Sequence, residues 1–146
     1  MIKSSRNLAA LCCVLSSLWA CAGQQTPPAS EDQVVTLGGQ RLTLENYQQQ
    51  CVLRQPDQSV LPLEMPWPCQ FAVNRQGKAH IESFNNVPIV IVLHVEVDPA
   101  NSRECRSEYR AIRQIAGKLE PSIVARSASC LRGAGDQKDY TGLFTW

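Results

Sequence analysis

The chain has no strong excess of charge of either sign. Its 14 Lys and Arg residues are nearly balanced by 13 Asp and Glu residues, which gives a formal net charge of +1. Proteins that bind nucleic acid through bulk electrostatics carry a strongly basic surface. We therefore expect no nucleic acid among its partners.

Long apolar runs and familiar catalytic motifs are also missing. The apolar run Leu8–Ala20 is shorter than the ~20 residues that a transmembrane helix needs. The sequence contains no G-x-S-x-G elbow, no phosphate-binding glycine loop, and no C-x-x-C pair of the kind that zinc sites use. We predict neither a catalytic residue nor a cofactor.

What the sequence does contain is an N-terminal pattern that is typical of an export signal. Met1–Arg6 carries two basic residues and no acid, and the apolar run Leu8–Ala20 follows it. The run closes with Leu18-Trp19-Ala20-Cys21, and residues 1–21 resemble a bacterial lipoprotein signal peptide. The resemblance implies cleavage before Cys21, attachment of lipid to its thiol, and stable anchoring by several acyl chains.

The same resemblance predicts where the protein resides. In that family the residue after the lipidated cysteine influences sorting, and Ala22, in place of Asp, implies the outer membrane. We expect an outer-membrane lipoprotein that faces the periplasm. The predicted organisation is a signal peptide over 1–20, a lipidated cysteine and flexible tether over 21–33, and one globular domain over 34–146.

Four further cysteines follow, at positions 51, 69, 105 and 130. An even number of cysteines in an exported chain predicts two disulfides, although ligation of a metal is the competing use. Three connectivities are possible. We favour Cys51–Cys69 with Cys105–Cys130, because nearest pairing closes two short loops, each worth about 3 kcal/mol.

The pattern of apolar residues predicts an α+β fold, with a small antiparallel sheet packed against one long helix. The helix is predicted over Ser102–Leu119, where apolar residues recur at spacings of three and four and Pro121 follows. Glycines at 38 and 39 predict a hairpin, and Val87–Val97 predicts a buried central strand. The remaining predicted segments are a short helix over Leu44–Leu53, an irregular stretch over Gln55–Pro68, and strands over Cys69–Val73, Lys78–Phe84, Ile123–Ala125 and Tyr140–Trp146.

Two surfaces are candidates for binding a partner. On the predicted helix, four arginines form a band beside the apolar stripe, suited either to an acidic partner or to simple solvation: Arg103, Arg106, Arg110 and Arg113. The second candidate is the stiff apolar segment Leu61–Pro68, with Met65 and Trp67 as its anchors. The alternative for this segment is that it covers one end of the core.

The two histidines suggest a metal site as an alternative. His80 and His94 each precede a glutamate by two residues, and a hairpin about Asn86 sets His80 opposite Val92. Both rings then share one face and can hold Zn or Cu. The competing interpretation is that they are solvent-side polar residues.

The leading functional hypothesis is an envelope lipoprotein that binds another envelope or secreted protein. It would act as an immunity protein, an inhibitor, or an accessory subunit of an envelope or secretion machine. The second hypothesis is a periplasmic lipoprotein that binds a metal or small ligand, and the third is a small envelope hydrolase that uses Glu or Asp.

Overall fold

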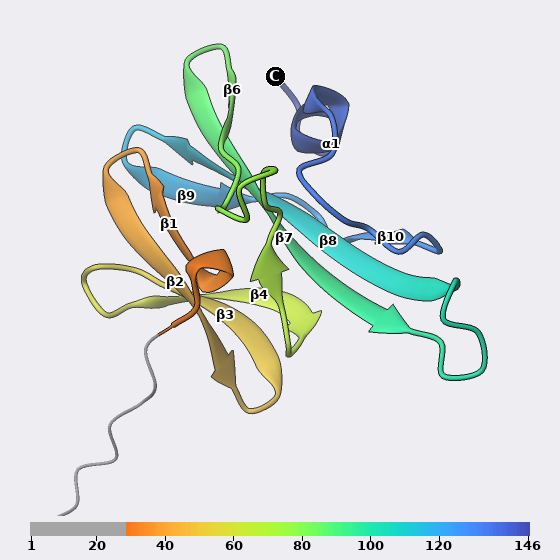
Figure 1. Cartoon of the computed structure of the whole chain (residues 1–146). Coiled ribbons are helices and arrows are strands. Elements are labelled where there is room, and N and C mark those ends of the chain that lie inside the picture. Colours follow the sequence, from red (N-terminus) through yellow and green to blue (C-terminus); the bar gives the residue numbers. More distant parts are fainter. Residues whose placement is uncertain (1–28) are drawn as a thin grey trace, which may run out of the picture.

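A computed structural model describes residues 29–146 (Figure 1). The predicted signal peptide, Cys21 and most of the predicted tether lie outside this range. The last tether residues, Glu31–Gln33, form a short 3-10 helix, η1. Ten strands and one short α-helix follow: β1 Val34–Leu37, β2 Gln40–Tyr47, β3 Gln50–Arg54, β4 Val60–Pro66, β5 Gln70–Phe71, β6 Glu82–Phe84, β7 Val87–Val97, β8 Cys105–Ile115, β9 Lys118–Pro121, β10 Ala125–Ser127 and α1 Gln137–Thr141.

The first sheet is an antiparallel meander of β1, β2, β3 and β4. Gly38 and Gly39 join β1 to β2 with φ of 52° and 82°, the positive values that a two-residue turn of this kind needs. This hairpin is as predicted. Gln48 and Gln49 make the same type of turn between β2 and β3, at φ of 51° and 63°, although neither is a glycine.

The second sheet has the order β10-β8-β7-β5, with β6 also pairing with β7 and β9 with β8. Its centre is the long hairpin of β7 and β8, in which Val97 pairs with Cys105 and Ile89 with Arg113. The predicted buried strand Val87–Val97 is confirmed with the same bounds. In the described part of the chain no helix is long and apolar enough to cross a membrane.

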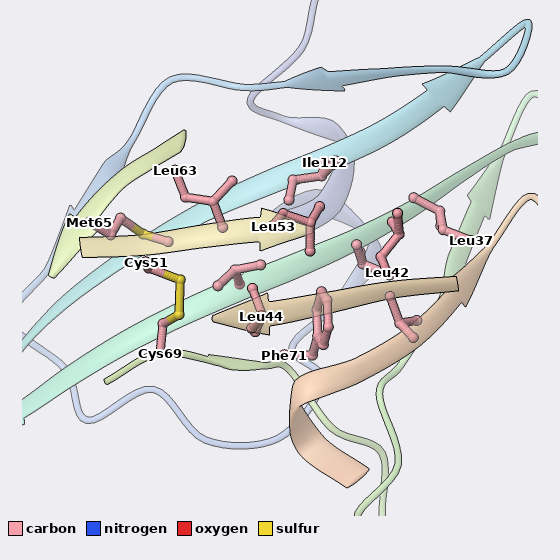
Figure 2. Packing of buried hydrophobic residues seen from close by; sticks show 13 residues of the cluster. Leu37, Leu42, Leu44, Cys51, Leu53, Leu63, Met65, Cys69, Phe71 and Ile112 are labelled. Atoms are coloured by element: carbon pink, nitrogen blue, oxygen red, sulfur yellow. A yellow bond between two sulfur atoms is a disulfide. The ribbon is translucent and has the colours of Figure 1, made fainter. Parts of the chain in front are cut away.

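The larger hydrophobic cluster fills the space between the two sheets (Figure 2). Leu53 and Leu63 from the first sheet meet Val90, Val92 and Ile112 from the second, and all five are fully buried. The Cys51–Cys69 disulfide closes one end of this cluster. Burying a side chain of this size stabilises the fold by about 1.5–3 kcal/mol, so the shared cluster holds the two sheets together.

The opposite face of β7 and β8 is covered by the C-terminal segment. Ile89, Ile91 and Leu93 point to this side and pack with Tyr140 of α1, whose side chain is fully buried. An Asp136 capping box starts α1. Because both faces of β7 are covered, its apolar residues are continuous and do not alternate with polar ones.

The predicted α+β class is wrong, because the described chain is built mainly of strands and lacks the long helix. Most of Ser102–Leu119 is β8, and Ala116-Gly117 then turns the chain back into β9 with φ of 49° and 77°. β8 is buried on both faces, and polar residues interrupt its apolar run. The remaining apolar residues fall by coincidence at helical spacing.

Four other segments also differ from expectation. Leu44–Leu53 is the β2–β3 hairpin, since its apolar residues alternate toward the core. Gln55–Pro68 contains β4, whose prolines are tolerated because β4 is an edge strand. Tyr140–Trp146 is no strand: Tyr140 belongs to α1 and the last residues follow it. The strand predicted at Ile123–Ala125 begins at Ala125.

Candidate protein-binding surface

Both predicted disulfides are confirmed, and they differ in position. Cys51–Cys69 lies in the core, whereas Cys105–Cys130 lies at the far end of the β7–β8 hairpin. The second bridge spans 25 residues and ties the start of β8 to the segment that follows β10. The chain therefore fastens an end of the molecule that the main cluster does not reach.

The loop between β7 and β8 is ordered by its own hydrogen bonds, not by burial. Every residue from Pro99 to Glu104 is exposed. The Asp98 N–H donates to the Glu104 carbonyl at 2.9 Å, and an Asp98 carboxylate oxygen accepts from the Ala100 N–H at 2.7 Å. Asn101 donates to the Glu104 side chain at 3.0 Å and accepts from the Arg103 N–H at 3.2 Å.

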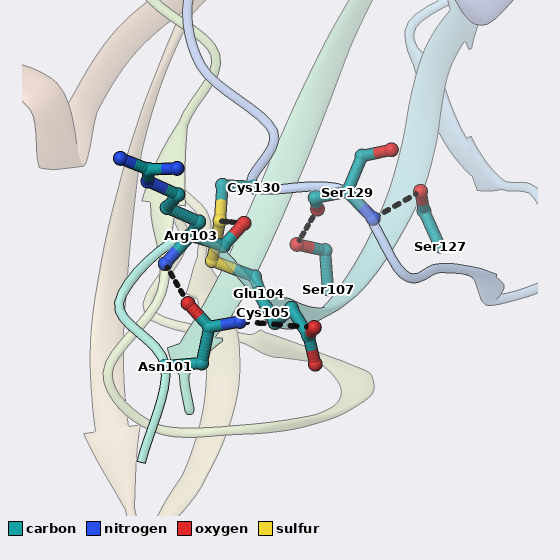
Figure 3. Close-up of a disulfide and its surroundings, with 8 residues drawn as sticks. All are labelled: Asn101, Arg103, Glu104, Cys105, Ser107, Ser127, Ser129 and Cys130. Carbon is teal, nitrogen blue, oxygen red and sulfur yellow. Dashed lines mark hydrogen bonds between the residues drawn. A yellow bond between two sulfur atoms is a disulfide. The ribbon is translucent and has the colours of Figure 1, made fainter. Parts of the chain in front are cut away.

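Contacts around the disulfide fix this loop relative to the sheet (Figure 3). Cys130 Sγ lies 3.6 Å from the Arg103 carbonyl oxygen. The buried Ser107 hydroxyl donates to the Ser129 carbonyl at 2.6 Å, and the Ser127 hydroxyl accepts from the Ser129 N–H at 3.1 Å. We call loop 97–104 together with the Cys105–Cys130 bridge the braced tip.

Two hollows flank the segment that follows the bridge. One of about 200 Å³ is lined by apolar residues that include Ile91 and Tyr109 and by the stretch Gly133, Ala134 and Gly135. The other, of about 450 Å³, lies beside the braced tip and is lined by the following residues: Asp32, Gln33, Pro68, Cys69, Gln70, Leu93, Val95, Val97, Cys105, Cys130, Leu131 and Arg132. Leu93, Leu131 and Arg132 line both.

The predicted band of four arginines does not form. Arg110 is buried, donating to the carbonyl oxygens of Ser122 at 2.6 Å and Leu63 at 3.0 Å. Arg113 lies on the other face of β8, because residues an odd number apart on a strand point to opposite sides. Only Arg103 and Arg106 are exposed, and both lie at or beside the braced tip.

Arg113 instead secures the C-terminus. Its Nε pairs with Glu120 at 2.9 Å, and its Nη1 donates to the Thr145 carbonyl at 3.2 Å. The guanidinium lies 4.5 Å from the Phe144 ring centre and 4.8 Å from that of Trp146. These contacts give Arg113 a structural role in holding the last residues against the sheet.

The two predicted anchors of the second surface, Met65 and Trp67, pack in or against the core. Met65 is fully buried in the main cluster, and Trp67 is half-buried against it. The Trp67 N–H donates to the Gln49 carbonyl at 3.0 Å, so the residue extends the contact between β4 and the β2–β3 turn. The burial of these two side chains supports the alternative interpretation, in which the segment covers one end of the core.

The two histidines contact different partners. β6 pairs with β7 over only three residues, and Phe71 of β5, not His80, lies opposite Val92. His94 Nδ1 lies 2.7 Å from the Pro68 carbonyl oxygen and donates to it. His80 lies instead beside Glu82, at 3.6 Å, and no three His, Cys, Asp or Glu side chains gather anywhere in 29–146 to hold a metal ion.

Glu82 belongs to a small polar cluster beneath α1. A hydrogen bond from the Ser83 N–H to the Glu82 carboxylate lowers the pKa of Glu82, and the Gln137 and His80 side chains lower it further. The His80 ring packs edge-on against Tyr140 at 5.5 Å, and the Tyr140 hydroxyl donates to the Ala134 carbonyl at 2.6 Å. An ionised Glu82 is unsuited to act as a general acid, and the geometry fits anchoring of α1.

Comparison with known proteins adds no name to this site. No protein-family model, no curated protein and no solved structure matches the chain. The site residues that sequence reasoning missed are Val95 and Val97, which line the larger hollow. Their apolar character is plain in the sequence, but their exposure depends on where β5 ends.

Proposed function

We propose that this protein is a cell-envelope lipoprotein, anchored through Cys21 in the outer membrane, that acts by binding another envelope or secreted protein through its braced tip. The N-terminal sequence supports the anchoring. The protein-binding role is supported mainly by one observation: an exposed loop is ordered by a disulfide at its end and by side-chain hydrogen bonds.

The ordering of an exposed loop suggests a role in binding, because an exposed loop adds little to the stability of the core. An apolar core stabilises a fold by removing side chains from water, whereas every residue from Pro99 to Glu104 is exposed. A loop that is already ordered loses less conformational entropy when it binds, so more of the contact energy appears as affinity. Inhibitors and immunity proteins benefit from such loops, and the proposal extends to both.

The charges of the tip define what to test. Arg103 and Arg106 are exposed on either side of the disulfide residue Cys105, and Figure 3 shows the Arg103 side chain pointing away from the loop. Exposed charges at the rim of an interface act chiefly on association rate and specificity. Reversing both arginines will therefore weaken binding of a partner. Because Arg106 lies opposite Glu96 in the β7–β8 pair, R106E also costs the fold about 0.2–1 kcal/mol, the size of one cross-strand pair.

The experiment is quantitative capture from detergent-solubilised envelope, with the full-length lipidated protein as bait. Wild type is compared with R103E/R106E, and R41E/R75E serves as the matched control because Arg41 and Arg75 are exposed elsewhere. We expect one stoichiometric partner that R103E/R106E loses and the control retains. Failure of wild type to retain any stoichiometric protein, or equal retention by both variants, would refute the proposal.

A further inference from the structure

The inference concerns the unpaired edge of β7 next to the braced tip. In an antiparallel sheet, each residue directs its N–H and C=O to one neighbouring strand, and the next residue directs them to the other. The Ala72 N–H donates to the Ile91 carbonyl at 2.8 Å, and Gln70 pairs with Leu93. The odd-numbered residues of β7 therefore direct their backbone groups toward β5.

β5 ends before it can pair with the next odd-numbered residues. Continued by two residues, the register that pairs Gln70 with Leu93 would bring Pro68 opposite Val95, but β5 starts only at Gln70. Proline has no N–H to donate, and the Pro68 carbonyl already accepts from His94 at 2.7 Å. Within the part of the chain that the structure describes, the backbone groups of Val95 and Val97 thus have no ladder partner on this side.

The space beside this edge is open and is lined by polar as well as apolar groups. It is the hollow of about 450 Å³ described above. The Val95 and Val97 side chains line it together with Leu93 and Leu131, and Val97 is 49 % exposed. Its two charged residues, Asp32 and Arg132, are opposite in sign and favour a segment without net charge.

We propose that an extended, uncharged segment of the partner protein adds to the sheet here, as a strand alongside Val95 and Val97. The inference rests on the proposed function and specifies how the partner is held. The edge beyond β5 presents both donors and acceptors without a strand partner, and another polypeptide backbone can pair with them in register. The braced tip lies at the end of this edge and meets the partner beside the added strand.

A second copy of the protein fits this edge poorly. If two β7 edges pair antiparallel so that Val95 of one bonds with Val97 of the other, Glu96 faces Glu96 across the pair. Like charges directly opposite on adjacent strands are destabilising. The geometry therefore favours a different chain as the occupant.

The test uses the full-length protein in detergent micelles and a synthetic probe, an acetylated and amidated peptide of alternating Thr and Val. Backbone amide signals of Val95 and Val97 are followed by NMR during titration. The control peptide has the same side chains but carries N-methyl groups on alternate backbone nitrogens, which removes its donors. Loss of two hydrogen bonds weakens binding about tenfold.

Two protein variants complete the design. In V95P the lost N–H is one that no described strand uses, so the β7–β8 ladder is retained; V95T keeps the N–H and serves as the control. We expect the unmethylated peptide to shift Val95 and Val97 amides in wild type and V95T, and V95P and the methylated peptide to bind at least about tenfold more weakly.

Each other outcome contradicts the proposal. These outcomes are unmoved Val95 and Val97 amides at millimolar peptide, equal binding of the methylated peptide, or a dimer in sedimentation that V95P abolishes. The envelope capture separates this failure from that of the proposed function. If V95P still captures the partner and R103E/R106E does not, strand addition is wrong and binding at the tip stands. If no variant captures a partner, the proposed function itself fails.

Discussion

Replacing Gly117 by alanine distinguishes the β8–β9 hairpin from the helix that the sequence predicts, because the two structures give effects of opposite sign. In the hairpin Gly117 has φ of 77°, and no atom lies within 4 Å of an added Cβ. The substitution therefore meets no steric clash. Its effect comes from backbone conformation alone.

The magnitude follows from two opposing contributions. An alanine held in the left-handed region costs about 1–2 kcal/mol, and the stiffer unfolded chain returns about 0.4–1 kcal/mol. We expect G117A to lower the free energy of unfolding by about 1 kcal/mol. In a helix interior the same change would raise it by about 1 kcal/mol, because alanine has the higher helix propensity.

Urea denaturation followed by circular dichroism measures this difference. With a slope of about 2 kcal/mol/M, the expected loss moves the midpoint down by roughly 0.5 M. Gly39 is the matched control, since it occupies the same turn position in the β1–β2 hairpin, at φ of 82°, with equally open space. G39A and G117A should lose similar stability. A midpoint that rises in G117A would refute the hairpin.

Four further predictions follow from the same structure. Q49G, which places glycine at φ of 63°, should raise unfolding free energy by about 1 kcal/mol in the urea assay, and a loss would contradict the β2–β3 turn. R110A should cost about 3 kcal/mol by leaving buried carbonyls unpaired, whereas exposed R106A should change stability by under about 0.5 kcal/mol; equal effects would refute the burial of Arg110. Burial raises the pKa of Tyr140 above its unfolded value of about 10, so the stability that its neutral side chain provides is complete below pH 10 and is lost as the pH rises further. The free energy of unfolding should therefore fall less steeply with alkaline pH in Y140F than in wild type, and parallel pH curves for the two proteins would contradict this. Removing the Cys105–Cys130 bridge as C105A/C130A should cost about 3 kcal/mol and speed amide exchange across loop 97–104, while unchanged exchange would show that the bridge does not order the tip.

The sequence predicts β7 well and β8 poorly for a physical reason. Both strands are buried on two faces, but β7 is filled by β-branched apolar residues that only a central strand commonly carries. β8 contains Ser107, Arg110 and Gln114, which are buried as well. Hydrogen bonds from distant segments satisfy Ser107 and Arg110, and no local pattern reveals such partners. The one local signal of a turn was Gly117 within the supposed helix.

The candidate site was predictable only in part. The number and spacing of the cysteines predict both disulfides correctly, because consecutive strands lie side by side in this fold and bring cysteines that are close in the sequence together. The four arginines were grouped by helical periodicity, and that grouping disappears when residues alternate along a strand. The open edge at Val95 depends on the register of β5 on β7 and on where β5 starts, which are tertiary properties.

The measurement that tests the central claim most directly is photo-crosslinking in intact cells that express the full-length protein. A photoreactive residue is placed at Val97 in one strain and at Ile115, also exposed but at the opposite end of the β7–β8 hairpin, in the other. We predict one dominant protein adduct from position 97 and none from position 115. Adducts of equal yield from both positions, or none from position 97, would contradict partner binding at the braced tip.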